Sequence, residues 1–299
     1  MRAFVTGGHG FVGPWLVQHL ESCGDEVVAP DGVDVTDRTQ VSDALAAARP
    51  DAVYHLAAQS SVRLSWDDPA DTFSVNVLGT VQLLGAVGSV VPEARVLIVS
   101  SVEVYGAVAP ADLPVGEDAP FAPVNPYAAS KAAAELAGLQ AHLGRGLQVI
   151  RARPFNHTGP GQTTRFFVPD LARQIIEADR SGASEVRAGN LVVKRDFSDV
   201  RDVVRAYRLL IEKGSPGGVY NVCSGRSVSL EDVVRRLLAL AGTDLPLVME
   251  SSRLRPVDVP DLRGDPSRLH EATGWQPAYD LDRTLTDVLD YWRAVADVA

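Results

Sequence analysis

The sequence contains few cysteines, few aromatic residues and little positive charge. Its only cysteines, Cys23 and Cys223, are far apart and have no metal-ligand spacing, so we predict neither a disulfide framework nor a metal site. We interpret both as buried thiols in a reducing compartment. The net charge of −10 argues against a basic groove, and therefore against nucleic acid as a partner.

Long hydrophobic runs are also lacking. We find no apolar run long enough to span a bilayer, and residues 2–6 resemble a first strand rather than part of a signal peptide. The chain of 299 residues is 46% hydrophobic and 22% charged, which is typical of a globular protein with one or two domains. We therefore expect a cytoplasmic protein with no membrane partner.

A glycine-rich stretch follows the first predicted strand and opens a predicted helix that runs to about Ser22. Its sequence is Gly-Gly-His-Gly-Phe-Val-Gly at residues 7–13. Glycines at positions 7, 10 and 13 allow a tight turn, close approach of the backbone to a pyrophosphate, and close helix packing. The helix N-terminus then favours the phosphates. This pattern predicts a dinucleotide site formed by Gly7, Gly10, Phe11, Val12 and Gly13.

The next segment offers candidates for the adenosine end of the dinucleotide. Residues 26–30 form a predicted second strand, and Asp31 beyond it could bind the adenosine ribose or be a solvated loop residue. We predict a short third strand over 33–37, where Asp34 and Val35 could border the adenine. Thr36 or Asp37 could equally cap a helix over about 38–48.

Strands and helices then alternate through the first half of the chain. We predict strands over 51–58, 95–101 and 147–152, and helices over 69–90 and about 125–143. This alternation is typical of a Rossmann-like, doubly wound parallel sheet in the α/β class. Small residues at the end of the strand over 51–58 leave room for a cofactor. Asn76 lies in apolar surroundings and needs partners, so we expect it to order strand ends or a cofactor.

The pattern changes after residue 153. We predict helices near 168–181, 200–213, 229–241 and 281–296, and short strands near 185–188, 218–222 and 246–249. We assign residues 1–153 to a dinucleotide-binding domain, to which the chain returns around 196–223. Residues 154–195 and 224–299 form a smaller α/β C-terminal substrate domain. Charged stretches such as Arg201, Asp202 and Arg205 are interpreted as solvated helix faces.

Tyr127 and Lys131 are four residues apart in the helix that begins near Asn125. This spacing places both side chains on one helix face. An ammonium near a phenol favours its ionised form, and such a tyrosine can exchange a proton with a substrate oxygen near neutral pH. An ordinary helix start with a surface lysine would show the same spacing.

Five motifs, in a fixed order along the chain, favour the catalytic interpretation of Tyr127 and Lys131, because together they resemble a known family. GGHGFVG at 7–13, HLAAQ at 55–59, NVLGT at 76–80, SSVEVYG at 100–106 and NPYAASK at 125–131 resemble the extended short-chain dehydrogenase/reductase family, which modifies nucleotide-diphosphate sugars. The resemblance implies that Tyr127 is the acid/base, that Lys131 lowers its pKa and holds the nicotinamide ribose, and that Ser101 binds the reacting sugar oxygen. It also implies an NAD(P)H cofactor, with further contacts from Leu56, Ala57, Ala58, Asn76 and Pro154.

The second half is similar to a subgroup of that family. RPFNHTGPGQ at 153–162, RDFSDV at 195–200, RPVDV at 255–259 and GDPSRLHEATGW at 264–275 resemble GDP-4-keto-6-deoxy-D-mannose reductases and the related GDP-mannose 4,6-dehydratases. The resemblance implies a GDP-sugar substrate. It assigns the sugar or phosphate to Asn156, the diphosphate to Arg195 and Arg255, and the guanosine ribose to Asp258. A forked guanidinium suits phosphate oxygens.

The run Ser101-Val102-Glu103 helps to distinguish reduction from dehydration. Dehydratases of this family with Thr-Asp-Glu at the matching positions have an acid to expel the 6-hydroxyl and a base for the C5 proton. Val102 cannot donate a proton, whereas Glu103 matches the base and could instead bind substrate. The mannose dehydratases also lack the middle Asp. The pattern therefore favours a reductase, in which Tyr127 donates the proton to the C4 oxygen and GDP-D-rhamnose or a close epimer is formed.

Two other functions fit the same motifs. One is a nucleotide-sugar 4-epimerase or 4,6-dehydratase that retains its NAD, and the other is a non-catalytic regulator that only binds a dinucleotide. The resemblance further implies a homodimer in which the helices around 70–90 and 126–143 form a four-helix bundle, and Ala133, Leu136, Ala137 and Gln140 fit such a contact. The sequence leaves the choice between NADH and NADPH open.

Overall fold

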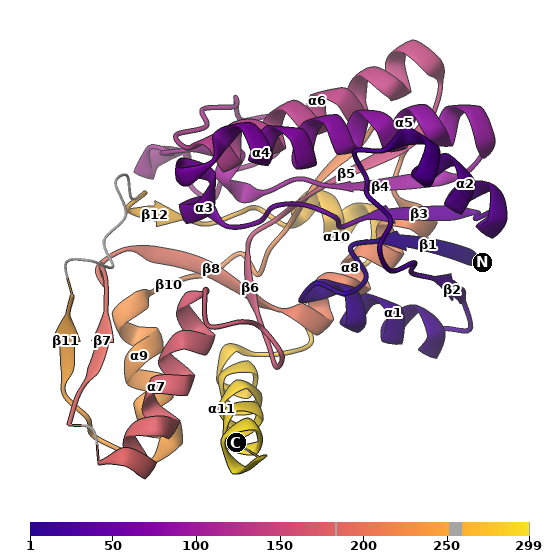
Figure 1. Ribbon diagram of the computed structural model, residues 1–299. Helices are drawn as coiled ribbons and strands as arrows, with labels where there is room; N and C mark the ends of the chain where they lie inside the picture. The colour runs from indigo at the N-terminus through magenta and orange to yellow at the C-terminus, as the bar shows by residue number, and fades with distance from the viewer. Residues whose placement is uncertain (183, 251–258, 299) are drawn as a thin grey trace.

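A computed structural model of the protein describes residues 1–182, 184–250 and 259–298 (Figure 1). Its centre is a six-stranded sheet in the order β2-β1-β3-β4-β5-β9, in which all neighbouring strands are parallel. The strands are β1 (Arg2–Thr6), β2 (Glu26–Val28), β3 (Ala52–His55), β4 (Arg95–Val99), β5 (Gln148–Pro154) and β9 (Val219–Val222). The predicted doubly wound parallel sheet is thereby confirmed.

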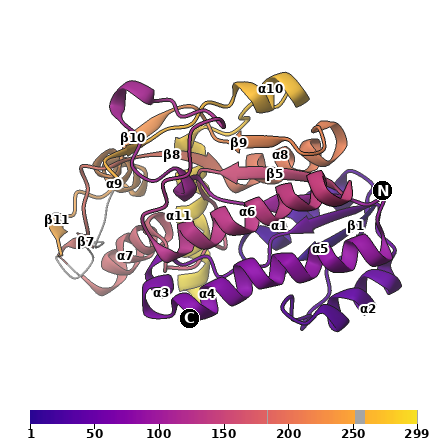
Figure 2. The same ribbon diagram turned by 90° about the horizontal axis from the view of Figure 1, so that it is seen from above.

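Helices cover both faces of this sheet because successive strand residues point to opposite sides. Phe4 packs with the helices α2 (Arg38–Ala48), α5 (Gly79–Val90) and α6 (Pro126–Arg145). Its neighbours Ala3 and Val5 pack with α1 (Val12–Ser22), α8 (Val200–Lys213) and α10 (Ser267–Thr273). Figure 2 shows α5 and α6 lying alongside each other over one face.

The predicted helix over 69–90 is divided into three parts. These are α4 (Pro69–Phe73), a π-helix over Ser74–Leu78, and α5, preceded by the short α3 (Val62–Asp67). The run Pro69–Val90 is long and apolar enough, by length and composition, to cross a membrane, which corrects our expectation that no such run exists. It packs against α2 and α6, and a core helix of a soluble protein has the same composition.

Two local predictions in the first half are wrong. Residues 33–37 form no strand, because the Asp34 carboxylate accepts the Thr36 N–H at 2.8 Å and closes a turn. Asp37 then caps α2 by accepting from Thr39 and Gln40. The exposure of Cys23 contradicts our prediction of two buried thiols, since only Cys223 is buried.

A second group of helices and strands lies below and to the left of the sheet in Figure 1. The helices α7 (Phe167–Ser181), α9 (Leu230–Ala241) and α11 (Leu281–Val298) share an apolar core with the paired strands β7 (Val186–Ala188) and β11 (Leu247–Met249). A second sheet contains β10 (Ser227–Ser229), β8 (Lys194–Asp199) and β12 (Asp261–Leu262), and β6 (Asn156–Thr158) also pairs with β8. The sequence predicted β7, β9 and β11 but none of the strands of the second sheet.

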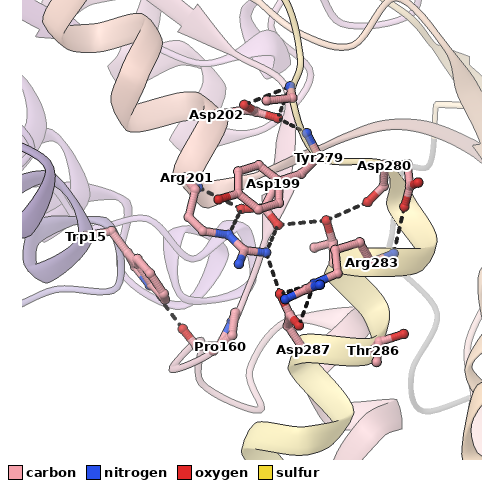
Figure 3. Close-up of polar contacts among 12 residues, drawn as sticks. Trp15, Pro160, Asp199, Arg201, Asp202, Tyr279, Asp280, Arg283, Thr286 and Asp287 are labelled. Carbon is pink, nitrogen blue, oxygen red and sulfur yellow. Dashed lines mark hydrogen bonds and ion pairs between the residues drawn. The ribbon is translucent and has the colours of Figure 1, made fainter.

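Arg201 connects α8 to α11 (Figure 3). Its guanidinium donates to the Asp199 carboxylate at 2.7 and 2.8 Å, lies 2.7 Å from Asp287, and stacks on the Tyr279 ring at 3.8 Å. Asp202 is buried and accepts the N–H groups of residues 278 and 279. These residues therefore form contacts between elements, not the solvated helix face that we predicted.

Candidate active site

The glycine turn between β1 and α1 is closely packed. A Cβ atom on Gly7, whose φ is +71°, would lie 2.6 Å from the Ala57 nitrogen at the end of β3. A Cβ on Gly13 would lie 2.2 Å from the Gly8 oxygen. Only glycine fits these two positions. Phe11, at the start of α1, provides no side-chain cap, so the first-turn N–H groups have no side-chain acceptor.

Asn125 sets the start of the helix α6, and Ser101 lies close to it. Asn125 caps the helix by accepting the Ala128 N–H at 2.8 Å, and its side-chain amide donates to Glu103 at 3.1 Å. Ser101 follows β4 at the carboxyl edge of the sheet and is hydrogen-bonded to the Tyr127 side chain. The structure therefore brings together Ser101, Glu103 and Tyr127 from two segments that are separate in the sequence.

Burial raises the pKa of Tyr127 to about 12, and the nearby Glu103 carboxylate acts in the same direction, while the hydrogen bond to Ser101 opposes both. This is the reverse of the lowering that we expected from Lys131, which is not among the groups that shift this pKa. The phenol is thus protonated at neutral pH. A protonated phenol is the form that a proton donor requires.

Lys131 is buried one turn further along α6. Burial lowers the pKa of its ammonium to about 8, and the Glu135 carboxylate partly opposes this shift. Lys131 follows Tyr127 by four residues, so the two residues share one face of α6.

Asn76 lies in the π-helix and connects three elements. Its side chain accepts the Gln59 N–H at 2.8 Å and donates to the Gln59 carbonyl at 3.0 Å and to the Ser130 hydroxyl at 2.9 Å. Ser130 in turn donates to the Tyr127 carbonyl at 2.7 Å. Asn76 therefore orders the segment after β3 and supports the start of α6.

The other predicted dinucleotide residues are spread along the carboxyl edge of the sheet. Leu56, Ala57 and Ala58 follow β3, and Pro154 ends β5 beside β9. The exposed Asp31 follows β2. The exposed Asp34 is engaged in the turn with Thr36, whereas Val35 is buried against Gly79.

The predicted substrate residues are only partly described. Asn156 lies in β6, and Arg195 is buried in β8, where it donates to the carbonyl groups of Lys194 and Val259. Arg255 and Asp258 lie outside the described residues. Val102 is buried in an apolar cluster with Ala132 and Phe155, so residue 102 supplies no acid.

Sequence reasoning missed two features. Phe11 stacks on His157, with ring centroids 6.2 Å apart, so the 155–162 segment lies against the glycine turn. Glu135 and Arg153 form a buried ion pair beneath α6, at 2.7 Å. The second could have been recognised, because Glu135 follows Lys131 by four residues and Arg151 and Arg153 alternate within a buried strand.

Comparison with known proteins shows the family of the chain. Residues 31–288 match the model of the GDP-mannose 4,6 dehydratase family. The chain belongs to this family. It is 39% identical over 297 residues to GDP-6-deoxy-D-mannose reductase of Pseudomonas aeruginosa, covering 98% of this chain and 97% of the relative.

Two solved structures of relatives have the same fold. The structure of RMD from P. aeruginosa complexed with NADPH has a TM-score of 0.92 at 39% identity, covering 98% of this chain and 99% of that one. The UDP-glucose 4-epimerase of Thermus thermophilus in complex with NAD has a TM-score of 0.89 at 29% identity, covering 98% and 99%.

Members of this family hold a dinucleotide, and the described residues include the structural features that such a ligand requires. The close glycine turn and the uncapped N-terminus of α1 suit a pyrophosphate. The described residues therefore fit the cofactor that the family implies.

Proposed function

We propose that the protein is an NAD(P)H-dependent oxidoreductase that reduces the C4 ketone of GDP-4-keto-6-deoxy-D-mannose to GDP-D-rhamnose. The observation that carries this proposal is the 39% identity, over nearly the whole of both chains, to a GDP-6-deoxy-D-mannose reductase. The hydrogen-bonded Ser101 and Tyr127 support it, because reduction of a ketone needs a proton donor at the carbonyl oxygen.

The roles of the side chains follow from this arrangement. The bound cofactor supplies the hydride. Ser101 and Tyr127 are hydrogen-bonded to each other, so both hydroxyls can contact one substrate oxygen. Ser101 stabilises charge on that oxygen, and Tyr127 protonates it. The high pKa of Tyr127 keeps this proton available at neutral pH. Lys131 binds the nicotinamide ribose.

The GDP moiety is assigned to the second half of the chain. Arg195 is buried and would contact the diphosphate together with Arg255, while Asn156 contacts the sugar or phosphate and Asp258 the guanosine ribose. Two arginines would also supply positive charge locally in a protein whose net charge is −10.

The test is turnover of purified protein with GDP-4-keto-6-deoxy-D-mannose and either NADH or NADPH. We expect loss of the reduced nicotinamide absorbance and formation of one C4 epimer. Tyr127→Phe should lower kcat by about 10²-fold or more, because it removes the proton donor. Absence of nicotinamide oxidation with both cofactors would refute the proposal.

An epimerase or dehydratase is the second candidate, and the similarity to an NAD-bound UDP-glucose 4-epimerase favours it. Such an enzyme would purify with NAD in stoichiometric amount and turn over without added reductant. A dinucleotide-binding regulator is a third candidate. Intact cellular function of Tyr127→Phe would favour that regulator over both enzymes.

We also propose that the protein is cytoplasmic and forms a homodimer through α5 and α6. Exposed apolar side chains gather on α3 to α6, namely Leu64, Trp66, Phe73, Leu78, Val81, Leu136 and Leu143. Leu136→Glu should produce monomers in sedimentation, whereas Leu240→Glu, an exposed leucine on α9, should not. A wild-type protein that is monomeric at micromolar concentration would contradict the dimer.

A further inference from the structure

The 155–162 segment is attached to the start of α1 at two points. Near one end of the segment, the His157 ring stacks on Phe11 with the two ring planes 9° apart. Towards the other end, the Trp15 indole Nε1 donates to the Pro160 carbonyl at 3.1 Å (Figure 3). Both aromatic side chains on the α1 side directly follow the glycine turn. The 155–162 segment therefore packs on the element that suits the pyrophosphate.

The same segment carries a residue that we assign to the sugar nucleotide. Its strand β6 contains Asn156 and pairs in parallel with β8, which carries Arg195. The proposed function gives Asn156 a contact with the sugar or phosphate and gives Arg195 a contact with the diphosphate. The position of the 155–162 segment relative to α1 therefore sets where these sugar-nucleotide contacts lie relative to the dinucleotide.

Hydrogen bonds within this segment make it stiff. The buried Thr158 hydroxyl donates to the Gln162 side-chain oxygen at 2.8 Å, and the Gln162 amide donates to the His157 carbonyl at 3.2 Å. The segment also packs closely on α8, because a Cβ atom on Gly159 would lie 2.6 Å from the Val200 side chain. A stiff, closely packed segment moves as one unit, so a contact at Pro160 also affects its other residues.

Trp15 also contacts the end of β8. The guanidinium carbon of Arg201 lies 6.0 Å from the centroid of the indole ring, and Arg201 is paired with Asp199, the last residue of β8 (Figure 3). An arginine at this distance from a tryptophan ring is attracted to it. One side chain on α1 thus contacts both the 155–162 segment and the arginine that is bound to β8.

We propose that Trp15 is a positioning residue that couples the dinucleotide site to the sugar-nucleotide site. The N-terminus of α1 has no side-chain cap, so a bound pyrophosphate would supply acceptors and order the first turn. Ordering this turn fixes Trp15 and, through the Pro160 carbonyl, the 155–162 segment. The sugar nucleotide then binds a segment that is already in place, so each ligand strengthens binding of the other.

The inference rests on the proposed function, because it takes this part of the chain to bind a GDP-sugar. The first experiment therefore uses GDP-mannose, which has no C4 ketone and is not reduced. Purified protein, freed of dinucleotide, is titrated with GDP-mannose by calorimetry, with and without a saturating amount of whichever of NADH and NADPH binds more tightly. We expect the dinucleotide to tighten GDP-mannose binding about fivefold or more.

Two matched variants test the role of the indole N–H group. Trp15→Phe keeps an aromatic ring but removes the donor, so the ratio of the two GDP-mannose affinities should fall below about twofold. Its affinity for the dinucleotide alone should stay near that of the wild type. Trp292→Phe makes the same change on α11, where the buried Nε1 has no hydrogen-bond partner among the described residues, and should keep the wild-type ratio.

Amide hydrogen exchange measures the link between α1 and the 155–162 segment without a sugar nucleotide. The dinucleotide alone should slow exchange in this segment of the wild type, and should slow it less in Trp15→Phe. Exchange in α9, which lies in the other group of helices, serves as an internal reference. The wild-type exchange and binding measurements both stand even where a variant fails to fold.

The outcomes separate this inference from the reductase proposal. GDP-mannose binding that is independent of the dinucleotide, or a wild-type ratio in Trp15→Phe, would overturn the role of Trp15 and leave the reductase proposal intact. An equal loss of coupling in Trp292→Phe would also overturn it. Failure of the wild type to bind GDP-mannose, with dinucleotide binding intact, would contradict the proposed function instead, and unchanged exchange in the 155–162 segment would then overturn the coupling as well.

Discussion

Arg153 and Arg201 are both paired with carboxylates, but in different surroundings. Arg153, on β5, donates three hydrogen bonds to Glu135 at 2.7 to 3.1 Å, and its side chain is only 4% exposed. Arg201, at the start of α8, is 19% exposed and is shared between Asp199 and Asp287. Their shortest bonds are equally short, so burial is what separates the two sites.

The two arginines connect different elements of the fold. The Glu135–Arg153 pair fixes the helix α6 to the sheet, and Arg153 also donates to the Tyr105 hydroxyl and the Glu117 carbonyl. Arg201 instead joins α8 to α11, across two parts of the molecule (Figure 3). A buried charge that loses its partner cannot be hydrated, whereas a partly exposed one can.

The largest effect is expected from Arg153→Met. Among the described residues, it leaves the fully buried Glu135 with the longer 3.4 Å contact from Arg151 alone, so the free energy of unfolding should fall by about 3–5 kcal/mol. Urea denaturation of the variant and wild type measures this difference. Restored stability in the double variant Glu135→Leu/Arg153→Met would show that the isolated charge is the cause. A loss below about 1 kcal/mol would contradict our assignment.

Arg201→Met should have an intermediate effect. It removes two ion pairs and the stacking on Tyr279, but Thr284 still donates to Asp199 at 2.7 Å and water can reach the site. We expect a loss of about 2 kcal/mol in the free energy of unfolding. Arg201→Lys keeps the charge but loses the forked geometry, and should recover only part of that loss. Full recovery in the lysine variant would mean that charge alone matters.

His55 extends the comparison to a buried base whose hydrogen-bond partners, within the described residues, are hydroxyls and not carboxylates. Its ring contacts the hydroxyls of Thr6 and Thr80 at 2.8 and 3.0 Å, and burial, with a smaller effect of Lys131, lowers its pKa to about 3. The folded state therefore binds fewer protons than the unfolded state between pH ~6.5 and ~3, so stability falls as pH falls through this window.

Between pH 7 and pH 5, this single group should cost about 2 kcal/mol of the free energy of unfolding. Denaturation at the two pH values, in wild type and His55→Gln, isolates its contribution. The variant should be less stable at pH 7 but less sensitive to the change. Equal pH sensitivity of the two proteins would contradict a neutral, buried His55.

Features that depend on neighbouring residues could be predicted from the sequence, whereas features that depend on burial and distant contacts could not. The central sheet and the glycine turn follow from local patterns, since strand, turn and helix signals lie within a few residues of one another. The strands β6, β8, β10 and β12 were missed because they are short and stabilised by pairing between distant segments. The elevated pKa of Tyr127 was missed because burial and the position of Glu103 depend on tertiary structure.

The smallest effect is expected from Arg173→Met, which serves as an exposed reference for the other two arginine variants. Arg173 forms a 2.7 Å ion pair with Glu177, as short as the pairs of Arg153 and Arg201, but its side chain is 36% exposed and that of Glu177 is 53% exposed. Because water solvates both charges, removing the pair should change the free energy of unfolding by less than about 0.5 kcal/mol. Urea denaturation at low and high salt measures it. A loss comparable to that of Arg153→Met would mean that distance, not burial, ranks these three sites.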